Sequence, residues 1–91
     1  MTFSVGLLGR GTVGSAFQEL LEERAPAIEQ ATGMRPEIAG VLTRTDGDFD
    51  DLVGRSDLVV ELIGGIEPAR EYILRAIEAG KHVVTANKAV L

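Results

Sequence analysis

Three glycines near the amino terminus have the spacing of a loop that binds phosphate through its backbone. Gly9, Gly11 and Gly14 lie between an apolar run and a helix-like pattern, in "GLLGRGTVGS". In such a loop the first glycine permits a sharp exit from a strand, the second lets a pyrophosphate approach, and the third lets the helix pack closely. The amides of Thr12 and Val13 would point at the phosphates from the positive end of the helix dipole. The pattern predicts a dinucleotide site, although the spacing alone also fits a tight turn.

Polar side chains beside these glycines could add to the site. Thr12 and Ser15 carry hydroxyls that could meet a phosphate or cap the helix. Arg10 is a candidate phosphate contact, and a solvated surface role explains it equally well. Gly64, which follows a later apolar run, is assigned to the same binding set.

A second set of polar residues follows the last apolar run, in "HVVTANKAVL". Asn87 is a plausible N-cap, which would place Lys88 in the first turn of a helix, where the dipole lowers the pKa of an ammonium. A lysine in that place could exchange a proton with an alcohol near neutral pH. Lys88 is therefore the candidate catalytic residue, and an ordinary solvated lysine remains the alternative.

Two other titratable residues stand out. Glu61, in "VVELIGG", lies near the end of an apolar run, and a buried carboxylate needs a partner. It either contacts a ligand or is tied to backbone amides, and we favour the structural role. His82 begins a short strand away from the expected crevice, so we expect no chemistry and no metal site there.

The elements that position these residues alternate between strands and helices. Apolar runs predict strands over residues 2–8, 36–43, 57–63 and 81–86. Helical spacing predicts one helical segment from Thr12 to Gly33, with a kink or a restart near Arg24 to Ala25 because of Pro26. The residues on its apolar face are Val13, Ala16, Phe17, Leu20, Leu21 and Ile28. A second helix is predicted from Pro68 to Gly80 with an exposed Glu71–Arg75 pair, and a short helical turn within 49–55.

This alternation predicts an α/β fold with a parallel sheet and right-handed crossovers. We expect a Rossmann-like doubly wound sheet of about four strands, in the spatial order second, first, third, fourth. A ligand would then bind in the crevice beside the first strand, at the carboxyl ends of the strands.

The end of the second strand distinguishes NAD from NADP in folds of this type. An acid there accepts a hydrogen bond from the ribose 2′-hydroxyl, whereas an arginine accommodates a 2′-phosphate. Here the end reads "VLTRTDGD", with Arg44 in that place and Asp46 as the first acid. The sequence favours NADP over NAD, and both would bind if Arg44 is only a surface residue.

The composition excludes several classes of protein. Nine basic and 14 acidic residues give a net charge of −5, which argues against a nucleic-acid partner or a basic membrane-surface helix. The chain has no cysteine, which excludes disulfides and thiolate metal sites. Its apolar runs are far shorter than the roughly 20 residues of a membrane helix. We expect a cytoplasmic protein.

Longer stretches carry a more specific signal than the glycine loop. "VGLLGRGTVGS" and "DLVVELIGGIEPAREYILRAIEAGKHVVTANKA" together resemble the amino-terminal, cofactor-binding domain of homoserine dehydrogenase, over nearly the whole chain. The resemblance implies an NAD(P)-dependent oxidoreductase that interconverts L-homoserine and L-aspartate 4-semialdehyde, in the biosynthesis of threonine, methionine and isoleucine. It also implies that Gly9 to Gly14 hold the pyrophosphate and that Lys88 lies beside the nicotinamide and the substrate.

Two departures from the family pattern limit what the resemblance implies. Only residues 44–56 separate the second and third strands, where the family usually has a longer segment, often with an extra edge strand. The family also continues beyond the position of Leu91 into a substrate-binding and dimerisation domain with a second lysine and acidic residues. We expect residues 1–91 to form one NAD(P)-binding domain that cannot turn over homoserine alone, from a protein that is a homo-oligomer at full length.

Two other interpretations stay open. Another two-domain dehydrogenase, of the sugar or dihydrodipicolinate type, would have an "EKP"-like end to its fourth strand, and "TANKA" argues against it. A non-catalytic nucleotide-sensing module would use the same fold without needing Lys88.

Overall fold

The computed structural model describes residues 2–9, 11–43, 47–63 and 67–85. Its strands are β1 (Thr2–Leu8), β2 (Arg35–Leu42), β3 (Leu58–Glu61) and β4 (His82–Thr85). Its helices are α1 (Thr12–Thr32), α2 (Phe49–Arg55) and α3 (Ala69–Glu78). Every strand and helix predicted within these residues is present, and the strand ends differ from the predicted bounds by at most two residues. The helix predicted to begin after Asn87 lies outside the described residues.

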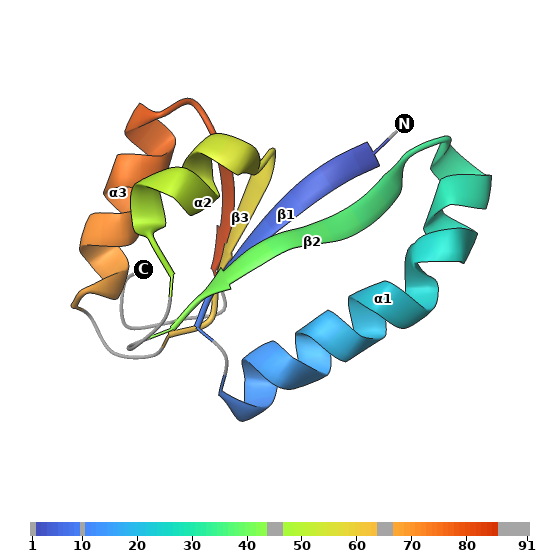
Figure 1. The fold of residues 1–91 in the computed structure, drawn as a ribbon, viewed down its shortest axis with the longest axis horizontal. Coiled ribbons are helices and arrows are strands. Elements are labelled where there is room, and N and C mark those ends of the chain that lie inside the picture. The colour runs from blue at the N-terminus through green and yellow to red at the C-terminus, as the bar shows by residue number, and fades with distance from the viewer. Residues whose placement is uncertain (1, 10, 44–46, 64–66, 86–91) are drawn as a thin grey trace.

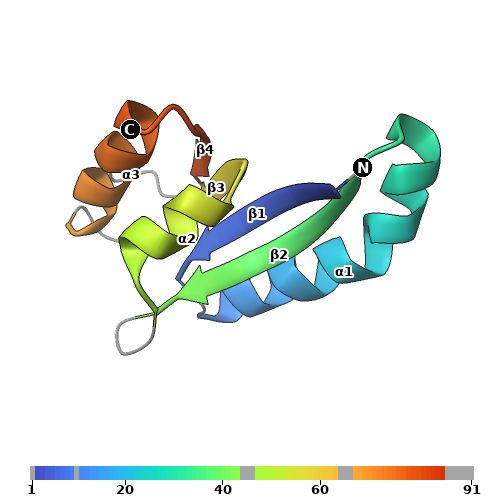
Figure 2. The ribbon, with the colours of Figure 1, turned by 45° about the horizontal axis from the view of Figure 1, so that its top comes forward.

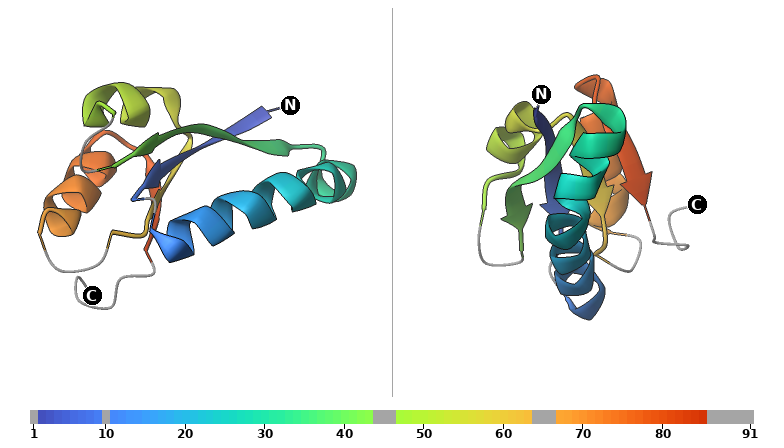
Figure 3. Two further views of the ribbon diagram at one scale, coloured as in Figure 1. Left: turned by 60° about the horizontal axis from the view of Figure 1, so that its bottom comes forward. Right: turned by 90° about the vertical axis from the view of Figure 1, so that its right-hand side faces the viewer.

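The strands form one parallel sheet in the order β2-β1-β3-β4 (Figure 1). Helix α1 lies on one side of the sheet, and α2 and α3 cover the other (Figure 3). The chain therefore leaves β1 in one direction through α1 and continues on the far side of β1 through β3 and β4. This confirms the predicted doubly wound, Rossmann-like α/β fold and the predicted strand order.

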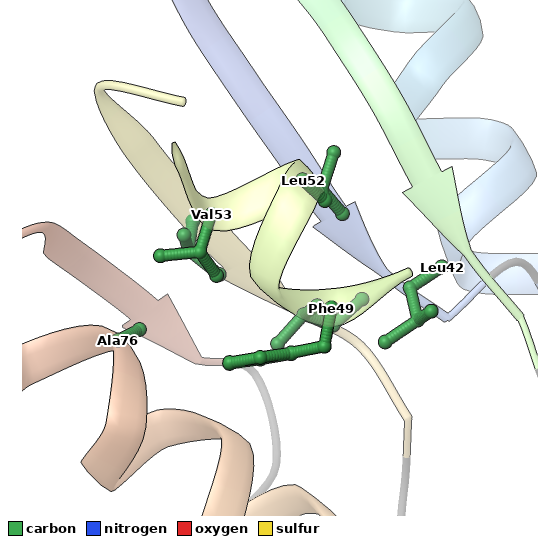
Figure 4. Packing of buried hydrophobic residues seen from close by; sticks show 7 residues of the cluster. Leu42, Phe49, Leu52, Val53 and Ala76 are labelled. Carbon is green, nitrogen blue, oxygen red and sulfur yellow. The ribbon is translucent and has the colours of Figure 1, made fainter. Parts of the chain in front are cut away.

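Alternating side chains of the strands build an apolar cluster on each face of the sheet. One cluster, on the face of α2 and α3, contains Leu8, Leu42, Phe49, Leu52, Val53, Val59 and Ala76 (Figure 4). The other contains Val5, Leu7 and Val60, with Phe17 and Leu21 of α1 packed against it. Because neighbouring strand residues point to opposite faces, Leu7 and Leu8 hold helices on both sides of β1. The sheet is therefore anchored from both sides around its central strand.

The apolar face predicted for α1 is only partly correct. Phe17 and Leu21 pack on the sheet as predicted, but Val13 and Leu20 are 62% and 52% exposed. The helix packs on the apolar cluster around β1, and this cluster covers only part of the apolar face of the helix. Helical periodicity thus identified the helix correctly and overestimated how much of its apolar face is buried.

The predicted effect of Pro26 on α1 is present as a bend. The helix continues through Pro26 without interruption, and Figures 1 and 2 show that it changes direction in its second half. Proline lacks an amide hydrogen and its ring crowds the preceding turn, which accounts for a bend at this point. The helix then ends at Gly33, whose φ of 79° is the left-handed conformation that commonly closes a helix.

The prediction that Glu71 and Arg75 form an ion pair is wrong: both residues are described, and they are not paired. Arg75 Nη2 instead donates to Asp50 Oδ1 at 2.6 Å, and its guanidinium lies 4.5 Å from the centre of the Phe49 ring. The same ring stacks on Tyr72 of α3. Helix α2 thus provides both a carboxylate and an aromatic face for Arg75. Arg75 contacts these groups instead of Glu71, and the contacts connect α3 to α2.

Candidate functional site

The strands end together at one edge of the sheet, where β1 passes into the glycine loop. Backbone hydrogen bonds continue one step past the strands: Gly9 N donates to Leu42 O, and Leu62 N donates to Leu8 O, both at 2.8 Å. The ends of β2, β1 and β3 are therefore fixed relative to one another. In a doubly wound sheet this edge, beside the first strand, is where ligands bind.

Gly9 makes the sharp exit from β1 that the sequence predicts. Its φ is +100°, a conformation that residues with a side chain rarely adopt. A Cβ atom there would also lie 3.1 Å from the carbonyl carbon of Leu62 and 3.1 Å from Cγ1 of Ile63. Both backbone conformation and space therefore require glycine at this position.

Gly14 and Gly11 have opposite surroundings. A Cβ atom on Gly14 would lie 2.7 Å from the carbonyl oxygen of Gly9, whereas one on Gly11 would meet no protein atom within 4 Å among the described residues. Gly14 thus allows the first turn of α1 to pack against the loop. The space beside Gly11 is open, which suits a backbone that must be approached by a ligand.

Gly14→Ala is expected to lower the free energy of unfolding by about 1–3 kcal/mol, because the added methyl group would collide with the Gly9 carbonyl. Gly54→Ala in α2 is the matched control: its Cβ would meet nothing within 4 Å, and alanine in a helix is favoured over glycine by roughly 1 kcal/mol. Urea denaturation measures both. A Gly14→Ala variant as stable as the unchanged chain would contradict the close packing.

The amino-terminal end of α1 can receive an anion. Gly11 is the N-cap and has no side chain to cap the helix, and the first turn contains no acidic residue. The first intrahelical bond runs from Ser15 N to Gly11 O at 2.9 Å, so the amides of residues 11–14 have no acceptor within the helix. Thr12 and Val13 are exposed there. These features fit the pyrophosphate of a dinucleotide, whose charge the helix dipole favours.

Glu61 and Thr85 are joined across the ends of β3 and β4. Thr85 Oγ1 donates to Glu61 Oε1 at 2.5 Å, and Ile63 N donates to Glu61 Oε2 at 2.6 Å. Glu61 is fully buried, so the favoured structural role, with a backbone amide as partner, is confirmed. Its pairing with Thr85 was missed. The matching sequences "LVVE" and "HVVT", paired residue for residue, contained that signal.

Several predicted site residues lie outside the described residues. These are Arg10, Arg44, Gly64, Asn87 and Lys88. Their assigned roles remain predictions. His82 is an exposed residue at the start of β4, at the end of the sheet opposite the glycine loop.

Other features of the described residues do not compete with the glycine loop. A groove of about 760 Å³ follows α1 and β2. Its charged lining residues are Glu22, Glu37 and Arg35, so the lining is acidic on balance, which disfavours a phosphate. Within the described ranges, acidic and histidine side chains form no group of three or more that could hold a metal ion. In the same part of the chain, every helix is too short or too polar to cross a membrane.

Comparisons with known proteins decide the family. The family model described as the NAD-binding domain of homoserine dehydrogenase matches residues 9–91. The chain belongs to this family. It is 47% identical to the homoserine dehydrogenase of Synechocystis and 42% identical to that of Pseudomonas aeruginosa, covering 100% and 96% of this chain.

Solved structures of homoserine dehydrogenases agree. The enzyme of Thiobacillus denitrificans matches with a TM-score of 0.90 and 38% identity over 99% of this chain. A Staphylococcus aureus enzyme matches with a TM-score of 0.91 and 31% identity over the whole chain. The fold and the glycine loop described above are therefore those of a homoserine dehydrogenase NAD-binding domain, which binds a nicotinamide cofactor.

The chain spans about a quarter of the length of the relatives it matches: 24% of the Synechocystis enzyme and 24% of the Thiobacillus chain. The alignment with the Synechocystis enzyme extends over 111 residues, although this chain has 91. That enzyme therefore carries residues within the aligned region that have no counterpart here.

Proposed function

We propose that residues 1–91 form the cofactor-binding domain of an enzyme that interconverts L-homoserine and L-aspartate 4-semialdehyde. The observation that carries the proposal is the open space at Gly11, beside the uncapped and acid-free N-terminus of α1. Membership of the homoserine dehydrogenase family supports the choice of substrate. When bound, the cofactor accepts or donates the hydride.

The residues of this chain hold and orient the cofactor. The amides at the start of α1 bind the pyrophosphate, and Gly9, Gly11 and Gly14 shape the loop around it. In this proposal Arg10 and Gly64 add further contacts to the cofactor. Lys88 lies beside the substrate and takes up or releases the proton of its hydroxyl group.

The rest of the full-length protein completes the enzyme. A second domain binds the amino acid, and the protein is a homo-oligomer in the cytoplasm, serving threonine and methionine biosynthesis. The test is an assay of the full-length enzyme, in which L-homoserine should drive reduction of NADP⁺ or NAD⁺, followed by the absorbance of the reduced nicotinamide. No reduction with homoserine by a folded full-length protein would overturn the substrate assignment.

Arg44 makes NADP the preferred cofactor in this proposal. Arg44→Ala should weaken binding of NADP⁺ by about tenfold, because a charge-assisted hydrogen bond to the 2′-phosphate is worth roughly 1.5–3 kcal/mol, and should leave NAD⁺ binding nearly unchanged. Calorimetric titration with each nucleotide measures the ratio. Arg24→Ala, at an exposed position of α1, is the matched control. An unchanged ratio in Arg44→Ala would show that Arg44 does not select the cofactor.

A further inference from the structure

At the carboxyl edge of the sheet, one side chain connects two neighbouring strands. Between β2 and β1, and between β1 and β3, backbone amides of Gly9 and Leu62 extend the ladder past the strands. Between β3 and β4 the side chain of Glu61 adds a connection, because Glu61 Oε1 accepts a hydrogen bond from Thr85 Oγ1. A fully buried carboxylate thus lies at the edge of the sheet where the cofactor is proposed to bind.

Both oxygens of this carboxylate are used inside the protein. Oε1 accepts from Thr85 and Oε2 accepts from the amide of Ile63. Glu61 and Thr85 are direct partners in the register of β3 and β4, so a short side-chain bond suits their separation. With 0% exposure, Glu61 cannot touch a ligand itself. Any effect it has on the site must pass through the residues that it holds.

Those residues lead directly into the site. Ile63 N donates a hydrogen bond to Glu61. The side chain of Ile63 lies against Gly9, because a Cβ atom on Gly9 would come within 3.1 Å of Ile63 Cγ1. Ile63 therefore packs behind the turn of the glycine loop. The chain that follows Thr85 contains Lys88 three residues later. One carboxylate therefore connects the support of the glycine loop to the end of β4, which lies three residues before Lys88 in the sequence.

Burial of a carboxylate is costly unless its charge is well paired, and an apolar pair could join two neighbouring strands at lower cost. We propose that Glu61 is a positioning residue of the cofactor site, which fixes the turn at Ile63 and the end of β4 relative to each other. This inference rests on the proposed binding of a nicotinamide cofactor at this edge. Thr85 is its partner in that role.

The test compares variants that remove the bonds with variants that keep them. Glu61→Leu and Thr85→Val remove the link while keeping similar volume. Glu61→Gln can still accept from Ile63 N and donate to Thr85, and Thr85→Ser keeps the hydroxyl. Ser56→Ala is the matched control, because Ser56 is also buried and hydrogen-bonded, to Leu52 O at 2.7 Å, but precedes β3 at its amino end.

Two measurements are made on each variant of the chain, at a temperature where circular dichroism shows it to be folded. The first is the dissociation constant for NADP⁺ and for NAD⁺, and the second is the set of backbone amide chemical shifts. We expect Glu61→Leu and Thr85→Val to weaken binding by about tenfold and to shift the amide signals of residues after Thr85. Glu61→Gln, Thr85→Ser and Ser56→Ala should stay within about twofold of the unchanged chain, with those signals in place.

The outcomes distinguish failure of the proposed cofactor binding from failure of the positioning role of Glu61. If the unchanged chain binds neither nucleotide, the proposed function fails, and the amide signals alone decide whether Glu61 holds the end of β4. If Glu61→Leu does not fold, the comparison of Thr85→Val with Thr85→Ser decides. Unaltered affinity and unaltered signals in a folded Thr85→Val variant would overturn the positioning role, as would equal losses in Ser56→Ala.

Discussion

Gly11→Val is expected to weaken binding of NADP⁺ by a hundredfold or more while leaving the fold intact. The new side chain would fill the open space at the N-terminus of α1, where the pyrophosphate approaches the backbone. Hydrogen bonds between amides and a charged group are worth roughly 1.5–3 kcal/mol each, so loss of two of them accounts for about a hundredfold. Isothermal titration calorimetry measures the change.

Stability should hardly change in the same variant. Gly11 has a φ of −72°, which any residue can adopt, and its Cβ would touch no described part of the protein. Gly54→Val, at an equally open position in α2, is the control for adding a side chain away from the loop. If Gly11→Val binds NADP⁺ as well as Gly54→Val does, the phosphate does not approach at Gly11.

Lys88→Ala in the full-length enzyme is expected to lower kcat for homoserine oxidation by about 10²–10⁴-fold, the range for removal of a general acid or base. The dissociation constant for the cofactor should change only a few-fold, because amides and not the lysine hold the pyrophosphate. Steady-state kinetics and a cofactor titration separate the two effects.

Lys81→Ala provides the matched lysine control for that experiment. Lys81 directly precedes β4, at the end of the sheet opposite the glycine loop, and its loss should leave kcat within about twofold. Unchanged turnover in Lys88→Ala would remove the catalytic role and would favour a domain that only binds nucleotide.

Much of the fold could be predicted because local patterns and topology rules agree. The run at 2–8, the glycines after it and the helical spacing that follows specify a strand, a tight turn and a helix. Right-handed crossovers then leave few arrangements of four parallel strands, and the observed order is the predicted one. The conformations of Gly9 and Gly14 follow from the same pattern, since the loop requires a positive φ at one and close packing at the other.

The errors concern contacts between elements that are distant in the sequence. Arg75 was assigned to Glu71, four residues away, but the packing of α2 on α3 brings Asp50 and Phe49 to it. Val13 has the right spacing for the apolar face of α1, yet spacing does not say how wide a stripe the sheet will cover.

The bond between Glu61 and Thr85 was also missed for this reason. The bond depends on how β3 and β4 are aligned with each other. The periodicity within a single segment does not give that register. The sequence identifies Glu61 as unusual for its position, and only the paired strands show that Thr85 is its partner.

The most direct test of cofactor binding at the glycine loop is a calorimetric titration of the folded chain with NADP⁺ and, separately, with NAD⁺. We expect saturable binding at one site, tighter for NADP⁺, and loss of the binding heat in Gly11→Val. A chain that is folded by circular dichroism and gives no saturable heat with either nucleotide would contradict this expectation, because the glycine loop and the N-terminus of α1 would then form a turn without a binding function.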